Sequence, residues 1–467
     1  MARSMSFYLF RGILMNLRFV QFLKKFSSFE NRIEKLSDII NYGRLISING
    51  LVLEVMGLKM PIGSECFIER IIDGQNVNIH AEVIGFSGEK TLLLSYEDIN
   101  GVFPGARVFL KLGSYVDRII KKMPLCVELL GRVLDGRGRP LDQLPKIDYK
   151  HYTVIKNDSI NPLHRTPITE VLDTGIRAIN GLLTVGRGQK IGIFSSSGIG
   201  KSVLLGMMAR YTQADVIIIA LIGERGREVK DFIENILGVE GLSRSVVIAA
   251  PADVSPLLKI QAASYATNIA EYFYKRNKHV LLIMDSLTRY AMAQREISLS
   301  LGEFPISKGY PSSIFSKIPM LVERTGIANK SKASITSFYT VLTEGEDEQD
   351  PISHLARSIL DGHIILSRHY SDLGHYPAID IESSISRVMP SIINTKQYNQ
   401  ALYFKKLVAS YQRNRDLINI GAYVNGTDLI LDHAIKIWPK LKKFLQQEIS
   451  EKSDYLISCE ALNEIFL

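Results

Sequence analysis

Cysteine is scarce in this chain of 467 residues, which has three: Cys66, Cys126 and Cys459. They lie far apart, are odd in number and form neither a CxxC pair nor a zinc-ligand spacing. This argues against a disulfide scaffold and against a cysteine-based metal site, and a reducing cytoplasm fits best. The nine histidines are scattered as well. Their spacing does not gather metal ligands on one helix face, so we interpret them as structural.

Long runs of one charge are also missing. The net charge is +8 and 22% of the residues are charged, but no block of five or more Lys and Arg occurs. A solvated basic surface is therefore favoured over a nucleic-acid-binding or membrane-binding patch, and we expect no nucleic-acid partner. The length suits about two to four globular domains.

Residues 1–40 carry a basic amphipathic pattern. Aromatic and aliphatic side chains dominate residues 7–29, but Arg11, Arg18 and Lys25 recur at intervals of seven and would share one helical face. These charges make a membrane-spanning helix costly. No small-residue cleavage site follows the apolar run, so we expect no secretory signal. Such a helix could dock on a membrane surface or on a partner helix, or pack on its own chain, and the pattern leaves these alternatives open.

The remaining chain divides into three parts. Residues 41–112 alternate short apolar runs, at 45–55, 77–84 and 91–95, with turn residues, which predicts a small β-barrel. Within residues 113–390, apolar strands alternate with helices, as in a parallel sheet covered on both faces. The candidate strands are 190–194, 216–221, 246–250, 280–285, 333–340 and 363–366. Residues 391–467 form a helical part, with an amphipathic stretch at Leu429–Leu445 interrupted at Pro439.

The strongest motif is SSSGIGKS at residues 195–202, which follows an apolar strand and precedes a helical run. This context is that of a Walker A loop, whose backbone N–H groups surround phosphates. Lys201 would bind the β- and γ-phosphates and Ser202 would ligate Mg²⁺. Ser195 departs from the pattern, which has glycine there, and a chance Gly/Ser turn is the structural alternative. The predicted nucleotide-binding residues of this segment are Ser197, Gly198, Ile199, Gly200, Lys201, Ser202 and Val203.

Two carboxylates follow apolar strand candidates. Asp285 closes the run 279–285 and fits a Walker B aspartate, which holds Mg²⁺. Glu224 follows the strand candidate 216–221, and a carboxylate at the carboxyl end of a parallel strand can orient an attacking water. Glu228 is the alternative base. An exposed set of loop ion pairs is the structural interpretation of the same segment.

At this point the motifs resemble a known family. GERGREV at 223–229 and DSLTRYAMAQRE at 285–296 are similar to the ATPases of type III protein secretion, relatives of the rotary ATP synthase α and β subunits. The segments 309–313, 360–368 and 374–389 agree. The nearest branch is the flagellum-specific ATP synthase, also called flagellar export ATPase, and the injectisome ATPase is its rival. The resemblance implies a RecA-like α/β core with a P-loop, an N-terminal small β-barrel and a C-terminal helical domain.

The resemblance also implies roles for individual residues. Arg387 would be an arginine finger that reaches a neighbouring subunit's γ-phosphate, and Tyr376 would stack on adenine, with a core tyrosine as the alternative. Arg225 and Arg289 would lie around the catalytic carboxylate. The implied catalytic residues are Glu224, Lys201, Arg387 and Arg225. The implied ligands of the Mg²⁺ that accompanies ATP are Ser202 and Asp285.

Because one chain carries both Glu224 and Arg387, a homo-oligomeric ring can complete every site, and the family implies a hexamer. The implied function is ATP hydrolysis coupled to the export of flagellar proteins. The implied partners are an export regulator, gate proteins of the flagellar apparatus, and export substrates with their chaperones. The implied location is the cytoplasm, peripheral to the inner face of the cell membrane at the flagellar base.

Two other classes of function stay open. An RNA-translocating ring ATPase would need a basic, aromatic platform in the small β-domain. The aromatic residues there are spread singly: Tyr42, Phe67, Phe86, Tyr96, Phe103 and Phe109. A non-catalytic subunit of a rotary machine is the other class, and the complete set of Lys201, Glu224 and Asp285 argues against it.

Overall fold

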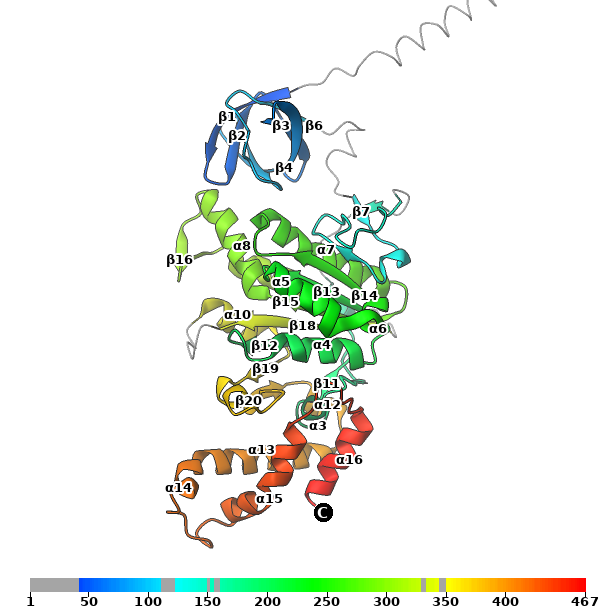
Figure 1. Ribbon diagram of the computed structural model, residues 1–467, viewed down its shortest axis with the longest axis vertical. Coiled ribbons are helices and arrows are strands. Elements are labelled where there is room, and N and C mark those ends of the chain that lie inside the picture. Colours follow the sequence, from blue (N-terminus) through cyan, green and yellow to red (C-terminus); the bar gives the residue numbers. More distant parts are fainter. Residues whose placement is uncertain (1–41, 111–121, 149–151, 155–159, 329–332, 344–349) are drawn as a thin grey trace, which may run out of the picture.

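Three parts follow one another along the long axis of the computed structural model (Figure 1): a β-barrel, an α/β layer and a group of C-terminal helices. The structure describes residues 42–110, 122–148, 152–154, 160–328, 333–343 and 350–467. The amphipathic helix expected within residues 1–40 lies outside the described residues.

The first part is a closed barrel with the strand order β1-β2-β5-β4-β3-β6. Its strands are β1 (Tyr42–Asn49), β2 (Val52–Met56), β3 (Glu65–Ile72), β4 (Gln75–Ser87), β5 (Lys90–Ser95) and β6 (Arg107–Leu110). The apolar run 45–55 is a hairpin rather than one strand, because Gly50 turns the chain with a φ of 60°. Alternate residues such as Leu53 and Ile68 fill the interior.

The second part is a sheet of eight strands in the order β20-β19-β12-β18-β15-β13-β14-β8. Every neighbouring pair is parallel except β19 and β20. The strands are β20 (Ile379–Ser386), β19 (Gly362–Leu366), β12 (Lys190–Ser195), β18 (Ser334–Leu342), β15 (His279–Asp285), β13 (Val216–Ile222), β14 (Ser245–Ala250) and β8 (Val133–Leu134). The six candidate strands of the sequence all belong to it.

Helices cover both faces of this sheet, which explains its continuous apolar strands. Alternate residues of β13 enter two different cores: Ile217 and Ile219 the first, Ile218 and Ala220 the second. The first core contains side chains of α3 (Arg177–Leu182) and α4 (Lys201–Tyr211), together with C-terminal helices. The second contains side chains of α7 (Pro256–Tyr274), α8 (Leu287–Ser300), α9 (Ile314–Val322) and α10 (Pro351–Ile359).

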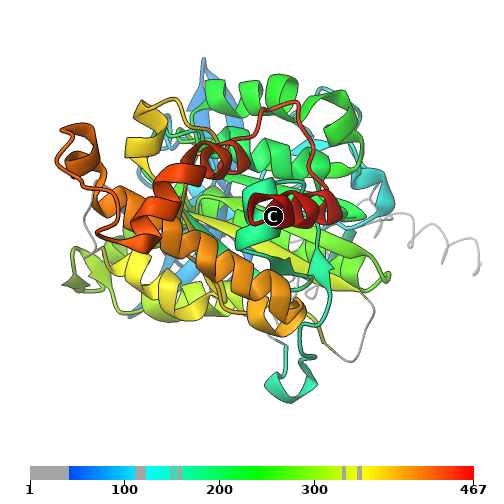
Figure 2. The ribbon, with the colours of Figure 1, turned by 90° about the horizontal axis from the view of Figure 1, so that it is seen from below.

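The C-terminal part consists of helices joined by loops. Its helices are α13 (Thr395–Arg413), α14 (Arg415–Asn419), α15 (Leu429–Leu445) and α16 (Tyr455–Ile465), which lie in front of the sheet in Figure 2, the view from below. The rings of Tyr411 and Trp438 stack with centroids 3.7 Å apart and join α13 to α15. The interruption expected at Pro439 does not occur, because α15 continues through this residue.

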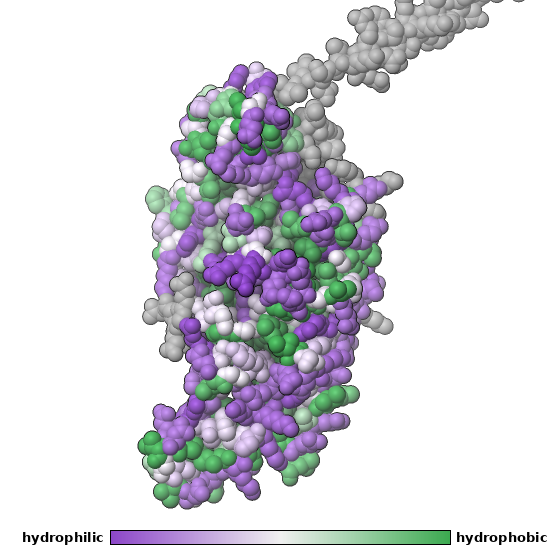
Figure 3. All heavy atoms as spheres, in the orientation of Figure 1, coloured by the Kyte–Doolittle hydropathy of each residue, from purple (hydrophilic) through white to green (hydrophobic). Residues whose placement is uncertain are grey.

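Short elements complete the described chain. They are β7 (Lys122–Pro124), η1 (Val127–Leu129), β9 (Tyr152–Val154), η3 (Pro162–His164), β10 (Val171–Leu172), β11 (Val185–Gly186), α5 (Gly226–Asp231), η4 (Phe232–Leu237), α6 (Gly238–Ser243), β16 (Pro305–Ser307), β17 (Tyr310–Pro311), α11 (Arg368–Asp372) and α12 (Met389–Ile392). Within the described ranges, no helix is long and apolar enough to cross a membrane. On the face drawn in Figure 3, apolar residues form separate patches among polar ones. The expected fold class, a barrel, an α/β core and C-terminal helices, is confirmed.

Candidate functional site

The expected site residues gather at one edge of the sheet. Strand β12 leads into the loop before α4, β13 ends just before Glu224, and β15 ends at Asp285. Because β12, β18, β15 and β13 are parallel neighbours, their carboxyl ends lie at the same edge. Lys201 begins α4 beside them. The fold therefore brings together three side chains that are far apart in the sequence.

The loop before α4 turns at two glycines. Gly198 and Gly200 have φ angles of 82° and 87°, a left-handed conformation that strains other residues. Gly200 is the N-cap of α4, so the first N–H groups of this helix border the loop. A Cβ on Gly200 would lie 3.3 Å from the ring of Tyr376. The other expected binding residues here are the exposed Ser197, the half-buried Ser202 and Val203, and the buried Ile199.

Lys201 lies between two carboxylates. Its Nζ donates to Glu224 Oε1 at 3.2 Å and forms an ion pair with Asp285 Oδ1. The side chains of Lys201 and Asp285 are only 10% and 3% exposed. Burial opposes the charged form of the amine, but Asp285 and Glu224 outweigh it and raise the pKa of Lys201. A permanent positive charge is thus held at the mouth of the phosphate loop.

The environment of Glu224 favours its protonated form more than water does. Burial raises the pKa of this carboxyl, Asp285 and Glu228 add to the rise, and Lys201 offsets only part of it. The backbone fixes its position, because Ala252 N donates to Glu224 O at 2.9 Å. A carboxyl with a raised pKa beside a cation is a common arrangement for a group that handles protons or water.

Thr340, which the sequence analysis missed, orients Asp285. Its Oγ1 donates to Asp285 Oδ1 at 2.6 Å, and the Thr340 side chain on β18 is fully buried. The sequence signal for this role of Thr340 is weak: a threonine near the carboxyl end of an apolar strand. The carboxylate is thereby held by one hydroxyl and by Lys201, both donors.

The donor set fits a magnesium ion that is bound together with phosphates. Mg²⁺ is usually held by one or two carboxylates, with waters and phosphate oxygens as its other ligands. The Asp285 carboxylate and the Ser202 hydroxyl supply oxygens of this kind. Among the described residues no group of three or more His, Cys, Asp and Glu side chains could hold a metal ion.

Ser195 does not disturb the turn of the loop. It ends β12 in register with Leu342, and its φ is not positive, so the backbone does not require glycine here. Its side chain is 1% exposed, and its Oγ has no hydrogen-bond partner among the described residues. Such a buried hydroxyl costs on the order of 1–3 kcal/mol. The departure from the motif therefore affects local stability rather than loop geometry.

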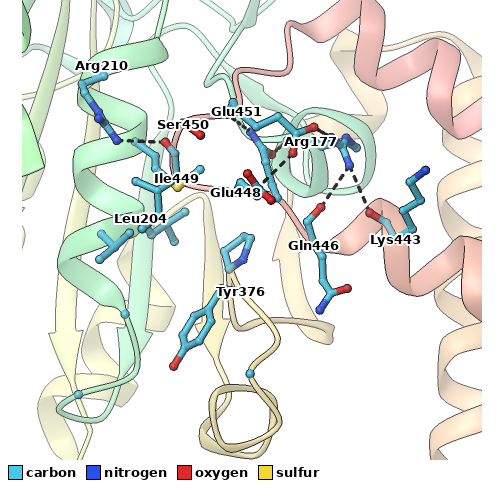
Figure 4. A pocket seen from close by; sticks show the side chains of 17 residues that line it. Arg177, Leu204, Arg210, Tyr376, Lys443, Gln446, Glu448, Ile449, Ser450 and Glu451 are labelled. Carbon is cyan, nitrogen blue, oxygen red and sulfur yellow. Dashed lines mark hydrogen bonds and ion pairs between the residues drawn. The ribbon is translucent and has the colours of Figure 1, made fainter.

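A cavity of about 1010 Å³ opens beside the phosphate loop. Gly198 and Gly200 line it from the loop, and Tyr376 and Pro377 line it from the segment after α11. The apolar residues Val203, Leu204 and Met207 line it from α4. Figure 4 shows Tyr376 and Leu204 facing this space. Tyr376 is 46% exposed and so is not a core tyrosine. A flat aromatic base could lie against it.

Arg387 lies at the opposite ends of the parallel strands, near their amino ends. It follows β20, which is antiparallel to β19, and Ser386 pairs with Gly362 at the amino end of β19. Arg387 N donates to Asp361 O, and its guanidinium donates to Arg357 O at 3.1 Å. Strand β12 has six residues, so its two ends are about 20 Å apart. The exposed Arg387 thus does not meet the Lys201 cluster of its own chain.

Two further arginines border the site differently. The side chain of Arg225 is 84% exposed and lies 3.7 Å from Glu228, so its guanidinium is in solvent rather than in the Lys201 cluster. Arg289 covers Gly223, since a Cβ there would lie 2.8 Å from the Arg289 side chain. Arg289 therefore contacts the residue before Glu224.

Known families and structures match this chain closely. The profile "ATP synthase alpha/beta family, nucleotide-binding domain" matches residues 175–386, and "T3SS EscN ATPase C-terminal domain" matches residues 393–464. A flagellum-specific ATP synthase of Buchnera aphidicola subsp. Acyrthosiphon pisum is 85% identical, covering 100% of both chains. One of Salmonella typhimurium is 57% identical, covering 97% of this chain and 99% of the relative.

Solved structures agree with the sequence matches. The assembled ATPase EscN from the type III secretion system of enteropathogenic E. coli superposes with a TM-score of 0.83 at 40% identity, covering 91% of this chain and 100% of that chain. The flagellar branch expected from the motifs is thus supported by higher identity than its injectisome rival. The chain belongs to the family of flagellum-specific ATP synthases, the ATPases of type III protein export that share their nucleotide-binding domain with the ATP synthase α and β subunits.

Proposed function

We propose that this chain hydrolyses Mg²⁺-bound ATP at sites shared between the subunits of a homo-oligomeric ring and thereby powers the export of flagellar proteins. The observation that carries the proposal is the position of Lys201 between Glu224 and Asp285, at the mouth of a glycine-turned loop. Phosphoryl transfer needs positioned charge more than covalent chemistry, and this cluster supplies it.

Before a nucleotide binds, the two carboxylates hold the Lys201 amine in place. When phosphates occupy the loop, the amine can turn to them, because its ion pairs are with side chains rather than with fixed backbone groups. Glu224 is then free to accept a hydrogen bond from the attacking water and to align it with the γ-phosphorus. Bound Mg²⁺, held by Ser202 and Asp285, would neutralise charge on the β- and γ-phosphates.

The separation of Arg387 from Lys201 supports a shared site. A guanidinium at the amino ends of the strands is too far to reach a phosphate at their carboxyl ends in its own chain. It is exposed, and a neighbouring subunit can bring its own phosphate loop against it. In a ring of identical chains, each subunit would then supply Lys201 and Glu224 to one site and Arg387 to the next.

The relatives support the ring and its setting. The EscN structure is described as an assembled ATPase, and a second EscN structure is a complex with its central stalk EscO. We propose by analogy that this chain forms a hexamer and contacts a stalk-like protein. Its further partners would be an export regulator, gate proteins and export substrates with their chaperones. The ring would work in the cytoplasm, at the inner face of the membrane below the flagellum.

Replacing the proposed base tests the function. Glu224→Gln keeps the shape of the side chain but cannot accept a proton, so it should bind ATP with near-normal affinity and lose turnover by about 100-fold or more. Glu228→Gln is the matched control and should retain most of the activity. Near-normal hydrolysis by Glu224→Gln would remove Glu224 from this role, and loss of activity only in the Glu228 variant would transfer the role to that residue.

A further inference from the structure

One side of the cavity beside the phosphate loop is formed by a segment of the C-terminal helical part. Residues 446–451, named here the wall segment, follow α15 and line the cavity with all six residues. On the opposite side the lining comes from α4, with Val203, Leu204 and Met207. The wall segment has no regular secondary structure across the cavity, so its position depends on the contacts that hold it.

Arg177 on α3 contacts both ends of the wall segment. Its guanidinium forms an ion pair with Glu451 and donates to the carbonyl oxygens of Lys443 and Gln446, each at 3.2 Å. Figure 4 shows Arg177 between these groups. The Arg177 side chain is only 15% exposed and that of Glu451 is 39% exposed. One guanidinium thus joins the end of α15 to the end of the wall segment.

Gln447 connects the wall segment to Tyr376, the residue proposed to stack on the nucleotide base. Its side chain is buried, donates to Gly175 O at 2.8 Å and accepts from Arg177 N at 2.7 Å. Its backbone N donates to Tyr376 O at 3.0 Å. The aromatic residue proposed to stack on the base and the wall segment are therefore fixed to each other by one residue.

Helix α4 holds the middle of the wall segment. Tyr211 Oη and the guanidinium of Arg210 donate to Ile449 O at 2.9 and 3.1 Å. This leaves the apolar side of Ile449 to face the cavity that it lines. Tyr376 and Ile449 both line the cavity, and an aromatic ring and an aliphatic side chain suit contact with a flat heterocyclic base.

We propose that Arg177 and Glu451 are positioning residues for nucleotide binding: their ion pair keeps the wall segment closed over the base, so that affinity for the base, but not for the phosphates, depends on it. This inference rests on the proposed ATPase function. It adds that the C-terminal part supplies the wall segment to the base half of each site, beside Tyr376 and α4, whereas the phosphate half is built at the carboxyl ends of the sheet strands.

The test compares ATP with a ligand that has no base. In the full-length protein, Glu451→Ala should raise the KM for ATP about three- to tenfold, as expected for loss of one partly buried ion pair, and change kcat by less than about twofold. Inhibition by inorganic triphosphate with Mg²⁺ should not change, because this probe occupies only the loop. Arg177→Ala should raise the KM further, since it also removes the donors to Lys443 O and Gln446 O.

Controls separate positioning from general damage. The partly exposed Glu451 can be replaced without burying a new group, and Glu451→Gln should give a smaller rise in KM because an acceptor oxygen remains. Glu234→Ala removes the carboxylate of an exposed pair with Lys230 outside the cavity, and should match the wild type. The double variant Arg177→Ala, Glu451→Ala should stay within about twofold of Arg177→Ala alone, since the two side chains act as one pair.

Two results would overturn the inference. One is an unchanged KM for ATP in Glu451→Ala and Arg177→Ala. The other is an equal loss of affinity for ATP and for inorganic triphosphate. Failure of the ATPase proposal is distinguishable, because the wild-type protein would then hydrolyse no ATP in the presence of Mg²⁺, whereas both results above require a wild type with a measurable KM for ATP.

Discussion

Thr340→Val removes one hydroxyl from the centre of the site and nothing else. Valine has the shape of threonine, and the position is fully buried, so the change replaces Oγ1 by a methyl group. The short hydrogen bond that is lost is the 2.6 Å bond to Asp285 Oδ1, together with a longer one of 3.5 Å to Met284 O. A hydrogen bond to a charged group contributes about 1.5–3 kcal/mol. Of its side-chain partners among the described residues, the carboxylate, itself 2% exposed, would then keep Lys201 alone.

The expected consequence is weaker use of Mg²⁺. Residues that orient a metal-binding carboxylate typically change metal affinity or activity by about 10–100-fold. We therefore expect the half-saturating Mg²⁺ concentration of the ATPase reaction to rise by about tenfold or more in Thr340→Val. Thr340→Ser keeps the hydroxyl and should stay within about threefold of the wild type. The assay is the steady-state rate at fixed ATP over a Mg²⁺ titration. A valine variant with the wild-type Mg²⁺ dependence and kcat would refute the orienting role of Thr340.

Two further predictions concern charge across the ring and within one site. Arg387→Ala should lower kcat by about 1,000-fold or more. Mixing this variant with the inactive Lys201→Ala variant should restore activity, because some subunit interfaces then combine an intact phosphate loop with an intact Arg387. No recovery of activity on mixing would argue against shared sites. The second is a pH profile: Glu224 must be ionised to accept the hydrogen bond from water, and its pKa is raised from an ordinary 4.5 by burial and Asp285. Turnover should therefore fall as the pH drops, with a midpoint above 4.5, whereas a level rate down to that pH would contradict the role.

The phosphate half of the site could be predicted because its signal is local. Strand β13 is buried at all seven positions, so its apolar run is continuous, and the predicted strand 216–221 ends one residue before the observed one. Glycines at 198 and 200 have the positive φ angles that the motif implies. Once parallel strands were assumed, the meeting of Glu224 and Asp285 with Lys201 followed from the common edge of their carboxyl ends.

Local patterns were insufficient where packing overrides propensity. Pro439 predicted an interruption, but α15 continues, because Ile437, Leu441 and Phe444 on one face are buried against the neighbouring helices. The tertiary contacts outweigh the loss of one backbone donor. In the barrel, the run 45–55 is mostly apolar but includes Ser47, Asn49 and Glu54, and the left-handed Gly50 divides it into two strands. Hydrophobic periodicity alone does not place this turn, whereas the glycine marks it as the first of the two loop residues between Asn49 and Val52.

The wall segment shows a limit of a different kind. Arg177 and Glu451 are 274 residues apart, and nothing in the composition of residues 446–451 distinguishes them from an ordinary polar connection between helices. Their meeting depends on how α3, α4 and α15 pack on one core, which is a property of the whole fold. The sequence motifs therefore mark the phosphate site and Tyr376, whereas the wall segment can be assigned to the base only after the C-terminal helices have been placed against the sheet. A search for the determinants of nucleotide choice in this family should accordingly begin at the end of α15 and not at the phosphate loop.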